Sequence, residues 1–199
     1  MEIEINPKAR ALIFDLDGTL SDSLPVHVTS WHLVCNKLNC TFDESIIVEM
    51  TGMPSIRFAE RIKKEQRLDI DAEEIVRMEQ QEFRRNIYQV KAHDAVVSLM
   101  KNAHGIIPMT VGTGSSRITA ILQLKELMID HFFDFIVTAD DVYRHKPEPD
   151  TFLKCSELLN IDPEYCQVLE DSEMGIQAAK AAGMIITDVR PFVSKPFSS

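Results

Sequence analysis

The stretch Ile13-Phe14-Asp15-Leu16-Asp17-Gly18-Thr19-Leu20-Ser21 joins an apolar run to two carboxylates that are one residue apart. Residues 11–14 are predicted to form a short buried strand, and the Gly-Thr pair must turn the chain just after it. Asp15 and Asp17 are therefore expected at the carboxyl end of a strand, where open α/β sheets build their sites. Because two acids this close repel each other, either a cation neutralises them or one stays protonated, and the stretch alone leaves both open.

Composition sets broad limits on the class of protein. The 199 residues, 45% of them hydrophobic, are enough for one domain or for a core with a smaller insert. A net charge of −10 argues against nucleic acid and anionic membranes as partners. No apolar segment approaches about 18 residues and no signal peptide is recognisable, so we expect a cytoplasmic protein. No Cys-x-x-Cys pair or His-rich cluster indicates a zinc site or a disulfide framework among Cys35, Cys40, Cys155 and Cys166.

Residues 23–91 are predicted to form a helical insert, or cap, because their apolar residues recur at helical intervals with no strand pattern between them. In the last of these helices, Ile75, Met78, Phe83 and Ile87 are expected to face inward. The expected helices cover residues 24–38, 43–50, 55–66 and 71–88, with a break at Thr51-Gly52.

Residues 92–199 alternate between helical and strand patterns, which indicates βαβ units and a parallel sheet. Together with residues 1–22 they are predicted to form a doubly wound, Rossmann-like α/β core into which the cap is inserted after the first strand. Strands are expected at residues 106–111, 135–138, 167–169 and 184–189, and helices at residues 95–103, 115–127, 150–159 and 173–182.

Three further loops follow predicted strand ends in this half. They carry Gly112-Thr113-Gly114-Ser115, Lys146, and the acidic pair Glu170-Asp171. Taken singly, each is an ordinary turn, a solvated lysine or a helix cap. Taken together at one sheet edge, they bring two acidic pairs, a cation and anion-gripping donors to one place, which suits Mg²⁺ binding and phosphoryl transfer.

The order Asp15-x-Asp17-Gly-Thr, Gly112-Thr113-Gly114, Lys146-Pro, Glu170-Asp171 resembles the haloacid dehalogenase-like phosphohydrolases over nearly the whole chain. The chain is most similar to the branch that contains β-phosphoglucomutase and small sugar phosphatases such as fructose-1-phosphate phosphatase. The resemblance implies that Asp15 is a nucleophile that forms an aspartyl phosphate, and that Asp17 is the general acid and base.

The same resemblance implies a Mg²⁺ site. Its expected ligands are Asp15, the backbone carbonyl of Asp17, and Asp171, with Glu170 binding directly or through water. The positions of Thr113 and Lys146 imply contacts to the phosphoryl oxygens and the nucleophile.

Substrate contacts are expected from both parts of the chain. Gly114 and Ser115 are candidates for gripping the phosphate. In the cap, His27 matches a histidine that reaches the site in relatives, although an ordinary polar residue of the helix is the alternative. Ser55 stands where β-phosphoglucomutase has an arginine for a second phosphate, and Arg57 is the nearest arginine.

The expected function is that of a Mg²⁺-dependent phosphatase acting, as a monomer, on small sugar phosphates such as fructose 1-phosphate. One alternative is a phosphohexomutase, an isomerase that passes the phosphoryl group from Asp15 to another sugar hydroxyl. The other is a phosphate-binding relative without turnover, which the presence of Asp17 and Lys146 disfavours.

Overall fold

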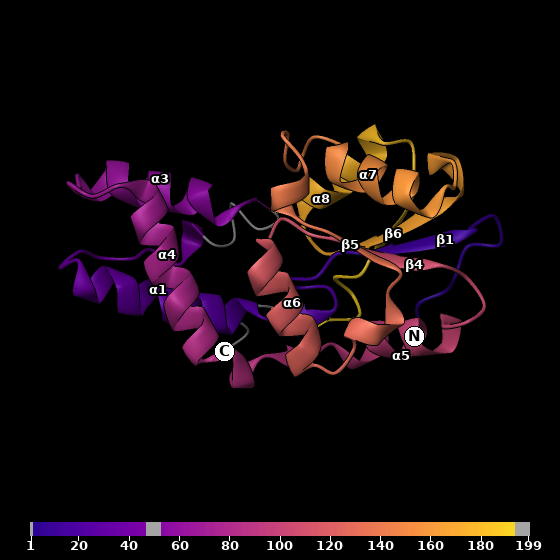
Figure 1. Cartoon of the computed structure of the whole chain (residues 1–199), viewed down its shortest axis with the longest axis horizontal. Coiled ribbons are helices and arrows are strands. Elements are labelled where there is room, and N and C mark those ends of the chain that lie inside the picture. Colours follow the sequence, from indigo (N-terminus) through magenta and orange to yellow (C-terminus); the bar gives the residue numbers. More distant parts are fainter. Residues whose placement is uncertain (1, 47–52, 194–199) are drawn as a thin grey trace.

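A parallel sheet lies between two layers of helices, with the cap beside it (Figure 1). The computed structural model describes residues 2–46 and 53–193. The sheet contains five strands in the order β5-β4-β1-β6-β7. The strands are β1 (Ala11–Phe14), β4 (Met109–Gly112), β5 (Phe135–Val137), β6 (Cys166–Glu170) and β7 (Ile185–Asp188). The predicted doubly wound, Rossmann-like core is confirmed.

Strand β1 occupies the centre of the sheet because it is apolar on both faces. It pairs with β4, where Phe14 lies opposite Val111, and with β6, where Phe14 lies opposite Leu169. All sheet pairings are parallel. The loops that leave β1, β4, β5 and β6 therefore emerge at one edge.

Side chains of β1 alternate between two hydrophobic cores. Leu12 and Phe14 pack with α5 and α6, while Ala11 and Ile13 pack with α7 and α8. The core helices are α5 (Asp94–Ala103), α6 (Arg117–Glu126), α7 (Asp150–Leu159) and α8 (Glu173–Ala181). Figure 1 shows α7 and α8 on one side of the sheet and α5 and α6 on the other.

The described part of the cap contains α1 (Leu24–Lys37), α3 (Ser55–Gln66) and α4 (Ala72–Arg85). Its interior is built around Trp31, whose ring stacks on Phe58 at a centroid distance of 6.1 Å. The predicted helix at 43–50 and the break at Thr51-Gly52 lie largely outside the described residues.

Two short strands connect the cap to the core. Strand β2 (Ser21–Asp22) pairs antiparallel with β3 (Lys91–Ala92), so the chain enters and leaves the cap at adjacent points. The domain boundaries at residues 22 and 92 stay a prediction. The two strands had no sequence signal because each is only two residues long.

Two predicted elements need correction. The strand expected at 106–111 begins only at Met109, after Pro108, and Ile106 is 82% exposed in the preceding turn. Because Pro cannot donate to a sheet ladder, it marks where the pairing can start. The helix expected at 71–88 ends at Arg85 and is followed by a short 3₁₀ helix, Ile87–Gln89. Further 3₁₀ turns cover Asp130–Phe132, Ala139–Asp141 and Pro163–Tyr165.

The four cysteines are free, and Cys35, Cys155 and Cys166 are buried. Burial of these three side chains is typical of cysteines that pack in a core. None of the helices within residues 2–46 and 53–193 is long and apolar enough to cross a membrane.

Candidate active site

An acidic cluster lies at the carboxyl ends of β1 and β6. Oxygens of Asp15, Glu170 and Asp171 all lie within 4.8 Å of one another. Burial raises the pKa of Asp15 well above its usual value, and the neighbouring Glu170 raises it further. Burial and Glu170 also raise the pKa of Asp171, to about 7. Burial and mutual repulsion therefore disfavour the ionised forms of Asp15 and Asp171.

Lys146 inserts a buried ammonium group into this cluster. Its Nζ donates to Asp15 Oδ1 at 2.6 Å and to Glu170 Oε2 at 2.7 Å, and it lies 4.6 Å from the centre of the Phe152 ring. Burial lowers the pKa of Lys146, but the two carboxylates outweigh it and raise the pKa above its usual value. Lys146 is therefore a fixed cation beside one oxygen of Asp15.

Two glycines make room for the acidic cluster. Gly18 has φ +91°, and a Cβ there would lie 2.2 Å from Asp171 Oδ2. A Cβ on Gly175, in the first turn of α8, would lie 1.9 Å from Glu170 Oε2. Glu170 Oε1 accepts from the backbone amide of Ser172 at 2.9 Å and from its hydroxyl at 2.7 Å. The start of α8 therefore holds Glu170 in place.

Asp17 has a different environment, made of neutral donors and the imidazole ring of His27. Its Oδ1 accepts from Ser23 Oγ at 2.6 Å and from Gln123 Nε2 at 2.8 Å. Its Oδ2 accepts from Ser115 Oγ at 2.6 Å and from Thr113 Oγ1 at 3.4 Å. Burial raises the pKa of Asp17, but His27 and these donors outweigh it and hold the pKa below its usual value.

His27 links the cap to Asp17. Its Nε2 lies 3.5 Å from Asp17 Oδ1, and its Nδ1 lies 2.8 Å from Glu79 Oε1 on α4. The imidazole stacks on Phe83 at a centroid distance of 4.1 Å. Burial lowers the pKa of His27, but Glu79 and Asp17 outweigh it and raise the pKa to about 10. The ring is therefore a cation shared between two carboxylates.

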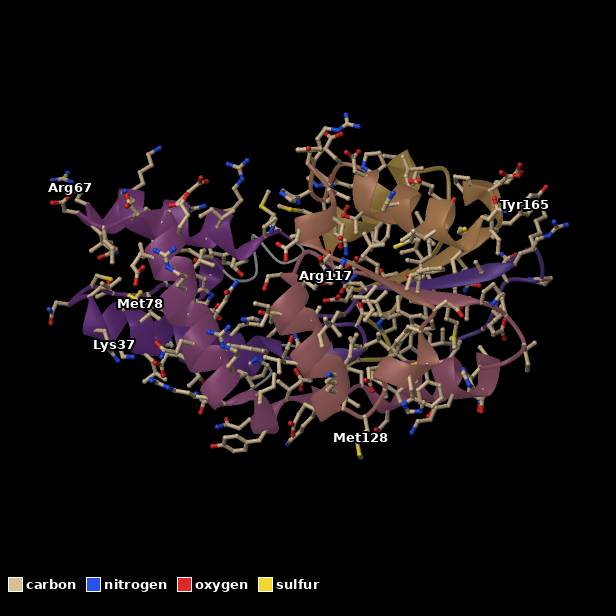
Figure 2. The ribbon with its side chains drawn as sticks, viewed as in Figure 1. Lys37, Arg67, Met78, Arg117, Met128 and Tyr165 are labelled. Carbon is tan, nitrogen blue, oxygen red and sulfur yellow. The ribbon has the colours of Figure 1, made fainter. Side chains whose placement is uncertain are left out.

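A cleft lies between the cap and the edge of the sheet that carries Asp15 and Asp17. Its core side is lined by Asp15, Asp17, Thr113, Gly114 and Ser115, and its cap side by Leu24, His27, Trp31, Met53, Ser55 and Phe58. Figure 2 labels Arg117, which marks the end of α6 that lies toward the cap and this edge. The cleft brings the expected phosphate-gripping loop and His27 to the same space as Asp15.

Arg57 does not line the cleft. Its Nη1 donates to Glu60 Oε2 at 3.1 Å, and 57% of its side chain is exposed. Its charge contributes to lowering the pKa of His145 in the loop before Lys146, after the larger effect of burial. Arg57 therefore lies near the core, outside the cleft, and its role in substrate binding stays a prediction.

The model of the haloacid dehalogenase-like hydrolase family matches residues 12–189. The chain belongs to this family. The hydrolase is 38% identical over 179 residues to the fructose-1-phosphate phosphatase YqaB of Escherichia coli strain K12. The alignment covers 90% of this chain and 95% of that protein. It is 26% identical to the beta-phosphoglucomutase of Bacillus subtilis strain 168, over 90% of this chain and 83% of that protein. A crystal structure of beta-phosphoglucomutase from Clostridium difficile superposes with a TM-score of 0.80 at 27% identity, covering 90% of this chain and 84% of that one.

Two buried residues of the hydrolase's site were missed by sequence reasoning. Gln123 accepts from Ser21 Oγ at 2.7 Å, which directs its amide nitrogen to Asp17. Glu79 is fully buried, and its Oε2 has no hydrogen-bond partner among the described residues. Glu79 stands on the buried face of the amphipathic helix α4, four residues after Ile75, so a polar residue in an apolar stripe was the available signal for it. The buried face of α6 mixes polar and apolar residues and gave no such signal for Gln123.

Proposed function

We propose that this hydrolase is a Mg²⁺-dependent phosphatase of small sugar phosphates, such as fructose 1-phosphate, acting through an aspartyl phosphate on Asp15. The observation that carries the proposal is the division between the two aspartates. Asp15 contacts Lys146 and the acidic cluster, whereas Asp17 is held by hydroxyl and amide donors and His27. The similarity to the fructose-1-phosphate phosphatase of E. coli supports the same substrate class.

The acidic cluster fits a divalent cation. Hard oxygen ligands in a compact group are what Mg²⁺ prefers, and the three carboxylates of this cluster have one buried ammonium group, Lys146, among them. Asp15, Asp171 and the backbone carbonyl of Asp17 would hold the ion, with Glu170 binding directly or through water. When bound, Mg²⁺ neutralises charge on the phosphoryl group as it is transferred.

Asp15 is the group suited to attack phosphorus. Lys146 favours its ionised form and restrains one oxygen, leaving the other to form the bond to phosphorus. As the Asp15 oxygen bonds to phosphorus, the bond from phosphorus to the sugar oxygen breaks. That leaving oxygen takes a proton from Asp17.

The second step releases phosphate. Water attacks phosphorus and gives a proton to Asp17, and the bond between phosphorus and the Asp15 oxygen breaks. The ionised form of Asp17, which His27 and the hydroxyl donors favour, is the base needed here, and the proton that it takes from water is the one that it gives to the sugar oxygen in the next turnover. Thr113, Gly114 and Ser115 are the candidates for contacting the phosphoryl oxygens during both steps.

Phosphate release from a panel of hexose and pentose phosphates, with and without Mg²⁺, tests the proposal. The wild-type protein should release phosphate only with the metal, and Asp15→Asn should remove at least about 99.9% of the activity while the protein stays folded. Absence of phosphate release by the wild-type protein across a broad panel of monoesters would refute the proposal.

A phosphohexomutase remains the second candidate, since two beta-phosphoglucomutases are among the similar proteins. It would use the same nucleophile and pass the phosphoryl group to a sugar hydroxyl. Conversion of β-glucose 1-phosphate to glucose 6-phosphate, with little free phosphate and a bisphosphate primer, would favour this activity.

A further inference from the structure

We infer that the cleft selects phosphate monoesters whose remaining part carries no ionised group, and discriminates against a second phosphate. The inference deepens the proposed function and rests on it. It follows from the difference between the two sides of the cleft, one of which carries the phosphate chemistry while the other is mostly apolar.

The cap side of the cleft is suited to an uncharged organic group. Leu24, Trp31, Met53 and Phe58 are apolar, and Ser55 adds one hydroxyl-bearing residue. Flat aromatic and aliphatic side chains favour the C–H faces of a sugar, while a few polar groups fix its orientation. A neutral sugar can therefore fill this side without leaving an ionised group unpaired.

No lysine or arginine lines the described cleft. The fixed cation of the site, Lys146, is buried and hydrogen-bonded to Asp15 and Glu170, at the end where the first phosphate must react. Among the residues that the structure describes, the remote end of a substrate therefore meets no lysine or arginine.

The two other cations near the cleft are already paired. His27 has Glu79 at one ring nitrogen and Asp17 near the other. Arg57, two residues after Ser55, contacts Glu60 on the exposed side of α3. A second phosphate, with a charge of about −1.5 to −2, would lie against apolar side chains and Asp17. Removing such a charge from water without a partner is strongly unfavourable.

The charges that line the cleft also distinguish the two candidate functions. A mutase primed by a sugar bisphosphate must bind both phosphates in one cleft, whereas a phosphatase needs to bind one. Among the described residues the cap side carries no lysine or arginine, and its imidazolium, His27, is paired with Glu79 and Asp17, which favours water over a second sugar hydroxyl as the acceptor from Asp15.

Matched substrates test the inference. We expect kcat/KM for fructose 1-phosphate to exceed kcat/KM for fructose 1,6-bisphosphate by at least about a hundredfold. We also expect kcat/KM for glycerol phosphate to exceed kcat/KM for phosphoglycerate. Calorimetric titration of the Asp15→Asn protein with each pair should show the same order of affinities. If the wild-type protein turns over neither member of a pair, the proposed function fails, and these affinities still decide the selectivity.

Ser55→Arg supplies the missing charge. Ser55 is half-buried at the first residue of α3, where a longer side chain can enter the cleft. The variant should raise the ratio of bisphosphate to monophosphate kcat/KM by about tenfold or more. Ser98→Arg, on the exposed face of α5 and away from the cleft, adds the same charge and should leave the ratio unchanged. Thermal unfolding verifies that both variants are folded, and Ser55→Lys replaces Ser55→Arg if that variant is not.

Equal kcat/KM and equal affinity for the members of each pair would overturn the inference. So would a Ser55→Arg protein, or its Ser55→Lys replacement, that is folded but has the same ratio as Ser98→Arg, because the charge at the remote end would then not limit binding.

Discussion

Replacing Gly175 with alanine tests how strictly the acidic cluster depends on the start of α8. The added Cβ would lie 1.9 Å from Glu170 Oε2 and 2.0 Å from its Cδ, whereas ordinary contacts begin at 3.4 Å. The carboxylate must therefore retreat by roughly 1.5 Å. The backbone of Gly175 cannot easily yield instead, because its amide donates to Ser172 Oγ at 3.0 Å.

This retreat breaks the contact between Glu170 and Lys146, which is 2.7 Å long in a fully buried setting. Removing one partner from a buried ion pair lowers the free energy of unfolding by about 3–5 kcal/mol. Alanine's higher helix propensity offsets about 1 kcal/mol. The net loss of about 2–4 kcal/mol corresponds to a Tm lower by roughly 5–15 °C in a chain of this length. We expect kcat to fall about 10- to 100-fold, as when a group that supports a metal ligand is displaced.

Calorimetry and phosphate release over a range of Mg²⁺ concentrations measure both effects. Gly105→Ala is the matched control, because Gly105 has φ +75° and nothing lies within 4 Å of its added Cβ. It should lose about 1–2 kcal/mol from backbone strain and keep its kcat. A Gly175→Ala protein with wild-type kcat, wild-type Mg²⁺ dependence and a Tm within about 2 °C of wild type would refute the reasoning.

Three further outcomes are expected. Mg²⁺ at about 100 times its Kd should stabilise the wild-type protein by about 2.7 kcal/mol and the Asp171→Asn protein by much less. Thermal unfolding with and without chelator measures this difference. Equal shifts in Tm for the two proteins would contradict Asp171 as a ligand. The pKa of His27 is near 10, above its usual 6.5, so the protonated ring stabilises the fold fully below pH 6.5 and the stabilisation is lost as pH rises through 10. The difference in free energy of unfolding between wild type and His27→Gln should therefore shrink across that range. A neutral imidazole in the NMR spectrum at pH 8 would contradict this expectation. Gln123→Leu removes a donor to Asp17 and should lower kcat about tenfold with KM within about twofold; a change confined to KM would argue against a positioning role.

Much of the core site could be predicted because it depends on strand ends. Asp15, Thr113 and Glu170 each lie at or just after the end of a parallel strand, and parallel pairing aligns those ends at one edge of the sheet. The strand over residues 106–111 was placed too early, because the pattern of Ile106 and Ile107 suggested pairing that Pro108 delays.

Contacts across the cap could not be predicted in the same way. One partner of Asp17 and one of His27 come from helices: Gln123 lies 106 positions from Asp17, and Glu79 lies 52 positions from His27. A helical period identifies the buried face, but it does not say which side chain on another element that face will meet. A lone polar residue in an apolar stripe therefore indicates a buried partner without naming it.

The sequence by itself determined the α/β core, the helical cap and the loops that carry the chemistry, because periodicity and turn residues act over a few positions. The tertiary structure alone decided the separate environments of Asp15 and Asp17, one beside a buried ammonium group and the other among neutral donors and an imidazole. It also decided that no lysine or arginine lines the described part of the cap side of the cleft. Both depend on which side chains packing brings within a few ångströms, where electrostatic interactions and desolvation are strongest.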